Sequence, residues 1–210
     1  MGKSTRTGDF FHFFILFAHQ KHKSEIQGDP MCGGESSAVQ GQLQSVTLIQ
    51  ATRHAFSAIC ADGTVVTWGD EASGGNSSLV QHQLRDVQQI KSTDSAFAAI
   101  LGSGNAVAWG DPDSGGDSRE VQDHLKNVRQ LHSTTGAFAA ILADGSVVTW
   151  GDESFGGDSR AVHHHLNDVR QLHSTDAAFA ALLGDGSLVT WGDPRYGGDS
   201  RGVEDEVQVL

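Results

Sequence analysis

Apolar and polar positions alternate along this chain in short runs that return at a fixed interval. From residue 28 onward, apolar runs are followed by a loop of glycine, aspartate and serine. The last apolar run ends four times in Trp-Gly-Asp, at Trp68, Trp109, Trp150 and Trp191, each 41 residues after the one before. Residues 28–191 thus form four periods without an insertion, and residues 192–210 begin a fifth. A fixed interval of this length is typical of tandem arrays, whose units are stable only when stacked on their neighbours.

Within one unit the pattern predicts three strands. The unit between the second and third tryptophans contains the runs VRQLHST (128–134), AFAAIL (137–142) and SVVTWG (146–151). Asp-Gly joins the last two runs, and this dipeptide predicts a hairpin because such turns need positive φ. The last two runs are apolar on both faces, as in strands that are covered on both sides. We therefore expect the tryptophans to be buried between neighbouring units.

A short amphipathic helix is predicted before the first strand of each unit. Val121, Leu125 and Val128 stand at i, i+4 and i+7 on one helical face, and Asp117 or Ser118 is available as the N-cap. The predicted fold is therefore mainly β. Tandem 41-residue repeats form a partial or open β-propeller arc, each unit having about three strands plus a short helix. Residues 1–27 lie outside the repeat, and residues 28–210 contain four repeats plus a truncated fifth.

The order of these pieces resembles a known repeat family. AFSAICADGTVVTWGDEASGG (55–75) contains a small-apolar strand, an Asp-Gly turn, a strand ending in Trp-Gly and a Gly-rich loop. This order is similar to the repeat of the regulator of chromosome condensation family, in particular to its short-blade, propeller-type members, and the resemblance covers residues 28–210. Those propellers typically close with seven blades. The resemblance therefore implies an arc that is a fragment, a smaller closed ring or half of an assembly.

The resemblance also implies a function. Members of the family include exchange factors for small GTPases, repeat arms of HECT-type ubiquitin ligases and inhibitors of other enzymes, which share a protein-binding surface. We therefore expect a non-catalytic protein-protein interaction scaffold whose partner is a protein, either basic or a small GTPase. The chain contains no phosphate loop or dinucleotide fingerprint. No catalytic residue, metal site or cofactor is predicted.

The loops that vary between units are the predicted partner-binding surface. Phe155 and Tyr196 share one offset in the repeat, and Arg119, Arg160 and Arg201 share another beside acidic residues. Exposed aromatic and arginine side chains dominate the binding energy of protein interfaces, so these five residues are the predicted contacts. An alternative function is a multivalent carbohydrate-binding propeller lectin, in which one tryptophan per unit stacks on sugar.

Other repeated polar residues are assigned to structure. The Trp-Gly-Asp aspartates are expected to cap the turn after each strand. The Gly-Gly-Asp-Ser motif returns every 41 residues, whereas calcium-binding repeats need it about every nine. His163, His164 and His165 are expected to form a solvated surface, because no other set of ligands has zinc spacing.

Charge limits the partners. The chain has 14 basic and 26 acidic side chains, a net charge of −12. Residues 1–27 contain four basic and two acidic side chains, so the repeats account for −14. Such a surface repels phosphate backbones, which disfavours nucleic acid and is compatible with a basic protein. The open edges of an incomplete ring also predict self-association, because unpaired strand edges are prone to it.

The N-terminal segment and the cysteines bear on location. FFHFFILFA (10–18) is shorter than the about 20 residues of a membrane helix. We expect a strand or short helix packed on the first unit, and the core of a signal peptide is the alternative. Cys32 and Cys60 occupy different places in the repeat, and two cysteines cannot build a dense disulfide framework. These features favour an intracellular location, cytoplasmic or nuclear.

Overall fold

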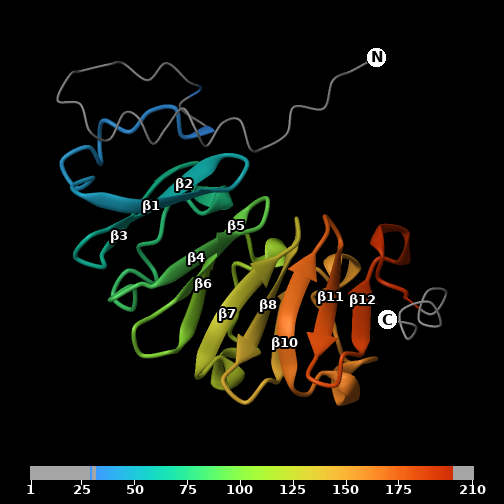
Figure 1. Cartoon of the computed structure of the whole chain (residues 1–210). Coiled ribbons are helices and arrows are strands. Elements are labelled where there is room, and N and C mark those ends of the chain that lie inside the picture. The colour runs from blue at the N-terminus through green and yellow to red at the C-terminus, as the bar shows by residue number, and fades with distance from the viewer. Residues whose placement is uncertain (1–28, 30–31, 201–210) are drawn as a thin grey trace.

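Four small antiparallel sheets, one for each period, stand side by side in chain order. The computed structural model describes Asp29 and residues 32–200, and in this part of the chain the sheets follow an arc that does not close (Figure 1). The mainly β repeat fold predicted from the sequence is therefore confirmed. The segment 10–18 and Arg201 lie outside the described residues. The strands are β1 (Val46–Ala51), β2 (Ala55–Cys60), β3 (Val65–Gly69), β4 (Gln89–Ser92), β5 (Ala96–Ile100), β6 (Ala106–Gly110), β7 (Val128–Ser133), β8 (Ala137–Leu142), β9 (Val147–Gly151), β10 (Val169–Ser174), β11 (Ala178–Leu183) and β12 (Leu188–Gly192).

Each sheet is a meander of three strands in sequence order. In the third sheet, β8 pairs with β7 on one side and with β9 on the other. The predicted Asp-Gly hairpin joins β8 to β9, and Gly145 has a φ of 83°, as such a turn requires. The first strands β1, β4, β7 and β10 contact one another and so line the inside of the arc.

The predicted short helix before the first strand is present as one 3-10 turn, which is shorter than the spacing of Val121, Leu125 and Val128 suggested. The segment between the loop and the first strand forms turns with a single 3-10 turn, η4 (Gln122–His124), and Val128 is the first residue of β7. Asn127 separates them with a φ of 55°, a left-handed conformation that an α-helix cannot contain. Leu125 is nevertheless buried, so the apolar spacing reflects packing and not a longer helix. No helix in the described ranges is long and apolar enough to cross a bilayer.

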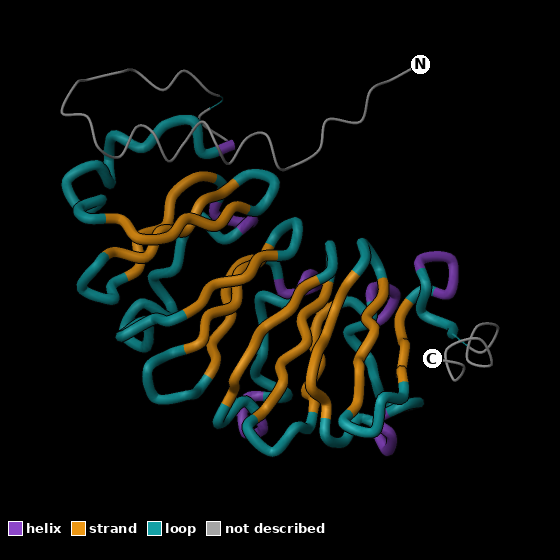
Figure 2. The backbone as a smooth tube through the Cα atoms, viewed as in Figure 1, coloured by secondary structure: helices purple, strands orange, loops and turns teal. Residues whose placement is uncertain are grey.

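The helical turns are confined to connections between strands (Figure 2). One type follows the last strand of a sheet and begins after the Trp-Gly-Asp aspartate. The other precedes the first strand of the next sheet. The described 3-10 turns are η2 (Glu71–Ser73), η3 (Pro112–Ser114), η4, η5 (Glu153–Phe155), η6 (His163–His165) and η7 (Pro194–Tyr196).

The hydrophobic core is divided among the seams between sheets. Trp150 is 5% exposed and stacks on Phe138 at 5.2 Å between ring centroids. Its indole Nε1–H donates to the carbonyl of Gly115, 35 residues earlier, at 2.9 Å. The other three tryptophans are equally buried and make the same bond at 3.0–3.1 Å. The prediction that the tryptophans lie between units is confirmed.

A second set of inter-unit bonds runs along one end of the inner strands. Ser92, Ser133 and Ser174 each donate from Oγ to a backbone carbonyl 41 residues earlier, always at 2.7 Å. Backbone bonds at the following turns continue this ladder, including Asp94 N–H to the carbonyl of Thr135 at 2.8 Å. Buried aromatic contacts and these polar bonds therefore fix the same spacing between successive units.

Candidate protein-binding surfaces

The loop after the third strand of each sheet is held in place by residues that repeat with it. In the third unit the Asp152 carboxylate accepts from the backbone N–H of Ser154 at 2.8 Å and so caps η5. Thr134 Oγ1 accepts from the N–H of Ala137 and donates to the carbonyl of Phe155 at 2.9 Å. Aspartates 70, 111 and 193 cap the equivalent turns, which confirms the structural role predicted for them.

The serine of Gly-Gly-Asp-Ser anchors the next part of the loop. Ser118 is buried, and its Oγ donates to the side-chain oxygen of Gln122 at 2.9 Å. The Gln122 amide in turn donates to the carbonyl of Ala106 on β6 at 2.9 Å. Ser159 is also buried and bonds to Thr149 of β9 at 3.0 Å. The motif thus fastens the loop to the third strand of its own sheet.

Arg119 and Arg160 project from these anchored loops into solvent. The side chain of Arg119 is 89% exposed. Its guanidinium donates hydrogen bonds to the carboxylate of Asp117, with Nε 2.9 Å from both oxygens. Arg160 holds Asp158 in the same way. These bonds hold the pKa of both aspartates below the ordinary range and raise the pKa of both arginines. Each loop therefore presents an ordered guanidinium at the same place in consecutive units.

The two predicted aromatic contacts differ in exposure. Phe155 is half-buried and packs against the core cluster between the third and fourth sheets. Tyr196 occupies the same offset in the last described unit and is 46% exposed. Arg195, beside it, is ion-paired with Asp193 at 2.7 Å. Of the five predicted contact residues, Arg119, Arg160 and Tyr196 are therefore displayed to solvent and Phe155 only in part.

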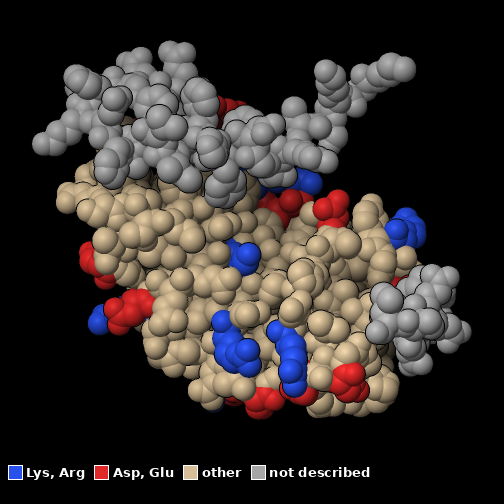
Figure 3. Space-filling view, in the orientation of Figure 1, with Lys and Arg blue, Asp and Glu red and all other residues tan. Residues whose placement is uncertain are grey.

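The inside of the arc is a second surface, which the sequence analysis did not identify. Its strands β1, β4, β7 and β10 contain three basic residues, Lys91, Arg129 and Arg170, and no acidic one. In Figure 3 basic side chains lie over the region of β4, β7 and β10, on a surface that is otherwise largely uncharged. Neither Lys91 nor Arg129 forms an ion pair with any residue of the described part. The signal available in the sequence was the basic and amide residues that return in the first strand of successive units.

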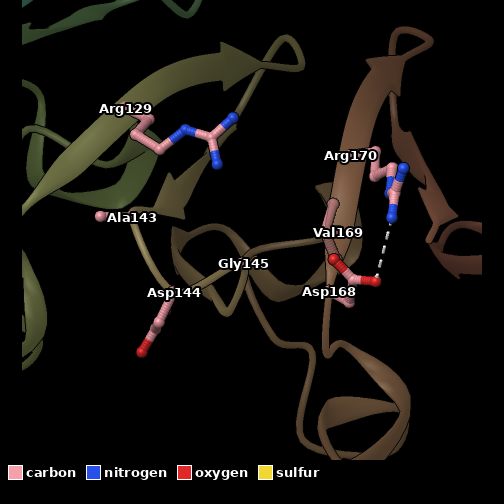
Figure 4. A pocket seen from close by; sticks show the side chains of 7 residues that line it. All are labelled: Arg129, Ala143, Asp144, Gly145, Asp168, Val169 and Arg170. Atoms are coloured by element: carbon pink, nitrogen blue, oxygen red, sulfur yellow. Dashed lines mark ion pairs between the residues drawn. The ribbon is translucent and has the colours of Figure 1, made fainter.

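Arg129 and Arg170 border a hollow of about 300 Å³ at one end of these strands. Figure 4 shows them on neighbouring strands, with Arg170 turned toward Asp168 and Asp144 pointing away from both. The Arg170–Asp168 pair is loose, at 3.6 Å between Nη2 and Oδ2. A second hollow, of about 470 Å³, lies at the other end of the inner strands and is lined by serines, threonines, Arg53, Asp94 and Asp176.

His132 on β7 lies between two other basic residues of the inner surface. The pKa of His132 is lowered to about 4, mainly by burial and in smaller part by the charges of Lys91 and His173. The imidazole is consequently neutral at pH 7. It can donate or accept a hydrogen bond without adding charge to the surface.

The tryptophans cannot serve as sugar-stacking platforms. All four are 4–5% exposed, because each indole is enclosed in a seam and bonded to a glycine carbonyl. The lectin alternative needed one solvent-facing tryptophan per unit, so this basis for it is removed.

Comparison of the sequence with protein families and with curated proteins finds no match. Solved structures do match. Yeast RCC1 (Prp20) bound to Kap60 superposes with a TM-score of 0.52 at 18% identity, over 74% of this chain and 45% of that one. Prp20p of Saccharomyces cerevisiae on its own gives the same score and identity, over 74% and 46%. The fold is that of an RCC1-like propeller.

Human WBSCR16 is also similar, with a TM-score of 0.46 at 17% identity, over 70% of this chain and 47% of that one. The chain spans less than half the length of these three structures. At such identities the likeness concerns the RCC1-like fold and not the activity. The resemblance inferred from the Asp-Gly and Trp-Gly motifs is thus confirmed at the level of structure.

Proposed function

We propose that this RCC1-like arc is a non-catalytic scaffold that binds a protein partner along its loop edge. The loop edge is formed by the loops that follow the third strand of each sheet and that carry Arg119, Arg160 and Tyr196. The observation on which the proposal rests is the pair of guanidinium groups of Arg119 and Arg160, ordered by Asp117 and Asp158 at equivalent places in consecutive units. A pre-ordered arginine loses little conformational freedom on binding, which favours its use in an interface.

The partner classes that fit are a basic protein and a small GTPase. Outside the three basic residues of the inner strands the chain has a net charge of −15, which favours encounter with a basic surface. Among solved proteins of this fold, Prp20 is bound to Kap60 in one structure, and Prp20p is described as binding Gsp1p and histones. Those partners support a protein-binding role for the fold and leave this chain's own partner to be identified.

Affinity capture with the full chain as bait tests the proposal. The loop variant combines Arg119→Gln, Arg160→Gln and Tyr196→Ala, three displayed side chains whose loss leaves the buried anchors intact. Quantitative mass spectrometry should find proteins that the wild type retains and the loop variant loses at least about tenfold, as expected when interface hot spots are removed.

The matched control is Arg85→Gln combined with Lys126→Gln, which removes two exposed basic side chains outside the Gly-Gly-Asp-Ser loops. This control should retain the same proteins as the wild type. If the wild type and the loop variant captured the same proteins, the loop edge would not be the binding surface. If the control also lost these proteins, their capture would not depend specifically on the loop edge.

A further inference from the structure

We propose that the inner surface of the arc, formed by β1, β4, β7 and β10, binds an acidic, extended segment of a partner protein. This surface is separate from the loop edge, so the proposal does not depend on the function assigned there. It rests on three observations: charge is segregated, Lys91 and Arg129 have no ion-pair partner in the described residues, and equivalent side chains of successive inner strands form rows.

Charge is strongly segregated between the inner strands and the rest of the molecule. Lys91, Arg129 and Arg170 give these strands +3, within a chain whose total is −12. Arg129 and Lys91 have no ion-pair partner in the described residues, and Arg170 has a distant one at 3.6 Å. Cations gathered on one face, two of them without an ion-pair partner among the described residues, produce a positive potential that attracts carboxylates.

The repeat places equivalent residues of successive inner strands in rows across the arc. One row contains Leu48, Gln89, Gln130 and Gln171, and another Gln50, Lys91, His132 and His173. The Gln89 side chain already accepts from the backbone N–H of Leu131 in the next unit at 3.2 Å. An extended peptide that crosses the strands would meet amide donors and acceptors beside the cations, and these can satisfy its backbone groups.

The same surface is poorly suited to nucleic acid. Strands β1, β4, β7 and β10 contain no phenylalanine, tyrosine or tryptophan on which bases could stack. A peptide segment can instead bind through its carboxylates and its backbone amides, which need no stacking surface.

Other units supply substitutions that the inner strands already accommodate. Thr47 and Gln88 occupy the place of Arg129 and Arg170, and Gln50 occupies that of Lys91. The variant Lys91→Gln, Arg129→Thr, Arg170→Gln therefore removes three charges with residues native to this position. It should keep the fold, which far-UV circular dichroism and thermal unfolding would verify.

The test measures the binding of a dye-labelled peptide by fluorescence anisotropy at low salt. The peptide is twelve residues long and alternates glutamate with serine. The inner-surface variant should bind at least about tenfold more weakly than the wild type, and added salt should weaken wild-type binding, since both effects follow from charge. A peptide with glutamine in place of glutamate should not bind.

The matched control is Arg85→Gln, Lys126→Gln, Arg195→Gln, which changes the net charge equally at exposed sites outside the inner surface. It should bind the acidic peptide as the wild type does. Equal weakening by both triple variants, or no binding by the wild type, would overturn the proposal. If an oligothymidine of the same length bound more tightly than the acidic peptide, the proposed ligand would be wrong and nucleic acid would be the ligand instead. Because this assay uses no loop-edge partner, its failure is distinguishable from failure of the capture experiment.

Discussion

At the residue scale, positive φ is concentrated where the chain turns most sharply. The glycine of each Trp-Gly-Asp has a φ between 104° and 109°, and a side chain there would meet backbone atoms. At Gly151 a Cβ would lie 2.7 Å from the carbonyl oxygen of Gly136 and 2.9 Å from the Cα of Ala137. Only glycine fits such a position without a shift of the backbone.

Gly151→Ala should therefore destabilise the protein by about 1–3 kcal/mol, the usual cost of a non-glycine residue in a strained backbone region. Urea unfolding followed by tryptophan fluorescence measures this loss. Gly41→Ala is the control, because a Cβ at Gly41 would meet no atom within 4 Å and its φ is not positive. If both variants unfolded at the same urea concentration as the wild type, the close approach at Gly151 would be of no consequence.

His132 predicts a dependence of stability on pH. Its pKa is lowered to about 4 in the folded protein, against about 6.5 in the unfolded chain. Between these values the unfolded state binds a proton that the folded state does not, so stability falls as the pH is lowered from about 6.5 to about 4. Asp117 and Asp158, whose pKa is also lowered, contribute only at pH values near and below about 4.

The variant His132→Gln, which copies Gln50 of the first unit, isolates this effect. Denaturant unfolding at several pH values should show a shallower loss of stability between pH 6.5 and 4 than in the wild type. Identical slopes for the two proteins would contradict the assignment to His132.

At the element scale, the seam between sheets is the unit of stability. The indole of each tryptophan reaches back to the loop of the preceding unit, so a sheet is complete only when its neighbour is present. Three clusters of buried residues correspond to the three seams between the four sheets. This arrangement follows from strands that are apolar on both faces and cannot be covered from within their own unit.

Trp150→Phe tests the polar part of one seam. Phenylalanine keeps most of the contact with Phe138 but leaves the carbonyl of Gly115 without its donor and opens a small cavity. The expected loss is about 1–3 kcal/mol in the free energy of unfolding, from an unsatisfied buried carbonyl and from the lost volume. Calorimetry should show a lower midpoint with one transition, and an unchanged midpoint would mean that the bond is not needed.

Strands and turns could be predicted from the sequence because their signals are local. Apolar runs predicted the strands, Asp-Gly pairs predicted the hairpin turns, and the spacing of Trp-Gly-Asp predicted the repeat. The predicted helix is reduced to one 3-10 turn because Asn127, with its positive φ, cannot continue a helix toward Val128. Asp86 and Asp168 hold the same conformation in other units, and aspartate or asparagine there was a usable signal.

The candidate surfaces were predictable to different degrees. The repeated loop arginines could be found from spacing alone. The inner surface could not, because it depends on which strand of each unit faces the inside of the arc. The basic and amide residues at 89–91 and 129–132 become one surface only when four units are stacked.

At the scale of the whole molecule, the arc ends in a sheet face that has no following unit among the described residues. In the three complete seams a Cβ on the loop glycine would lie 2.7–2.8 Å from a phenylalanine ring of the next unit, whereas at Gly197 it would meet no atom of the described residues within 4 Å. Leu182 and Leu188 are half-buried there, although their equivalents Ile141 and Val147 are each 1% exposed. Partly exposed apolar side chains at an open face favour association.

We therefore expect concentration-dependent self-association through the last sheet. Light scattering coupled to size-exclusion chromatography should show a rising mass with concentration, and Leu182→Lys should reduce it at least several-fold by placing a charge on that face. Leu79→Ser is the control, since it removes a leucine that is 89% exposed elsewhere. A monomer at all concentrations would exclude this role of the last sheet.

The constant separation of 35 residues between each indole and its glycine acceptor has a consequence for the gene. Every tryptophan is bonded to the glycine at the same offset in the repeat. An in-frame deletion or duplication of one period would therefore place a tryptophan beside a glycine that can accept the same bond. Copy number can thus change by recombination without any new contact having to arise. The near-identity of the later units is what such a history would leave behind.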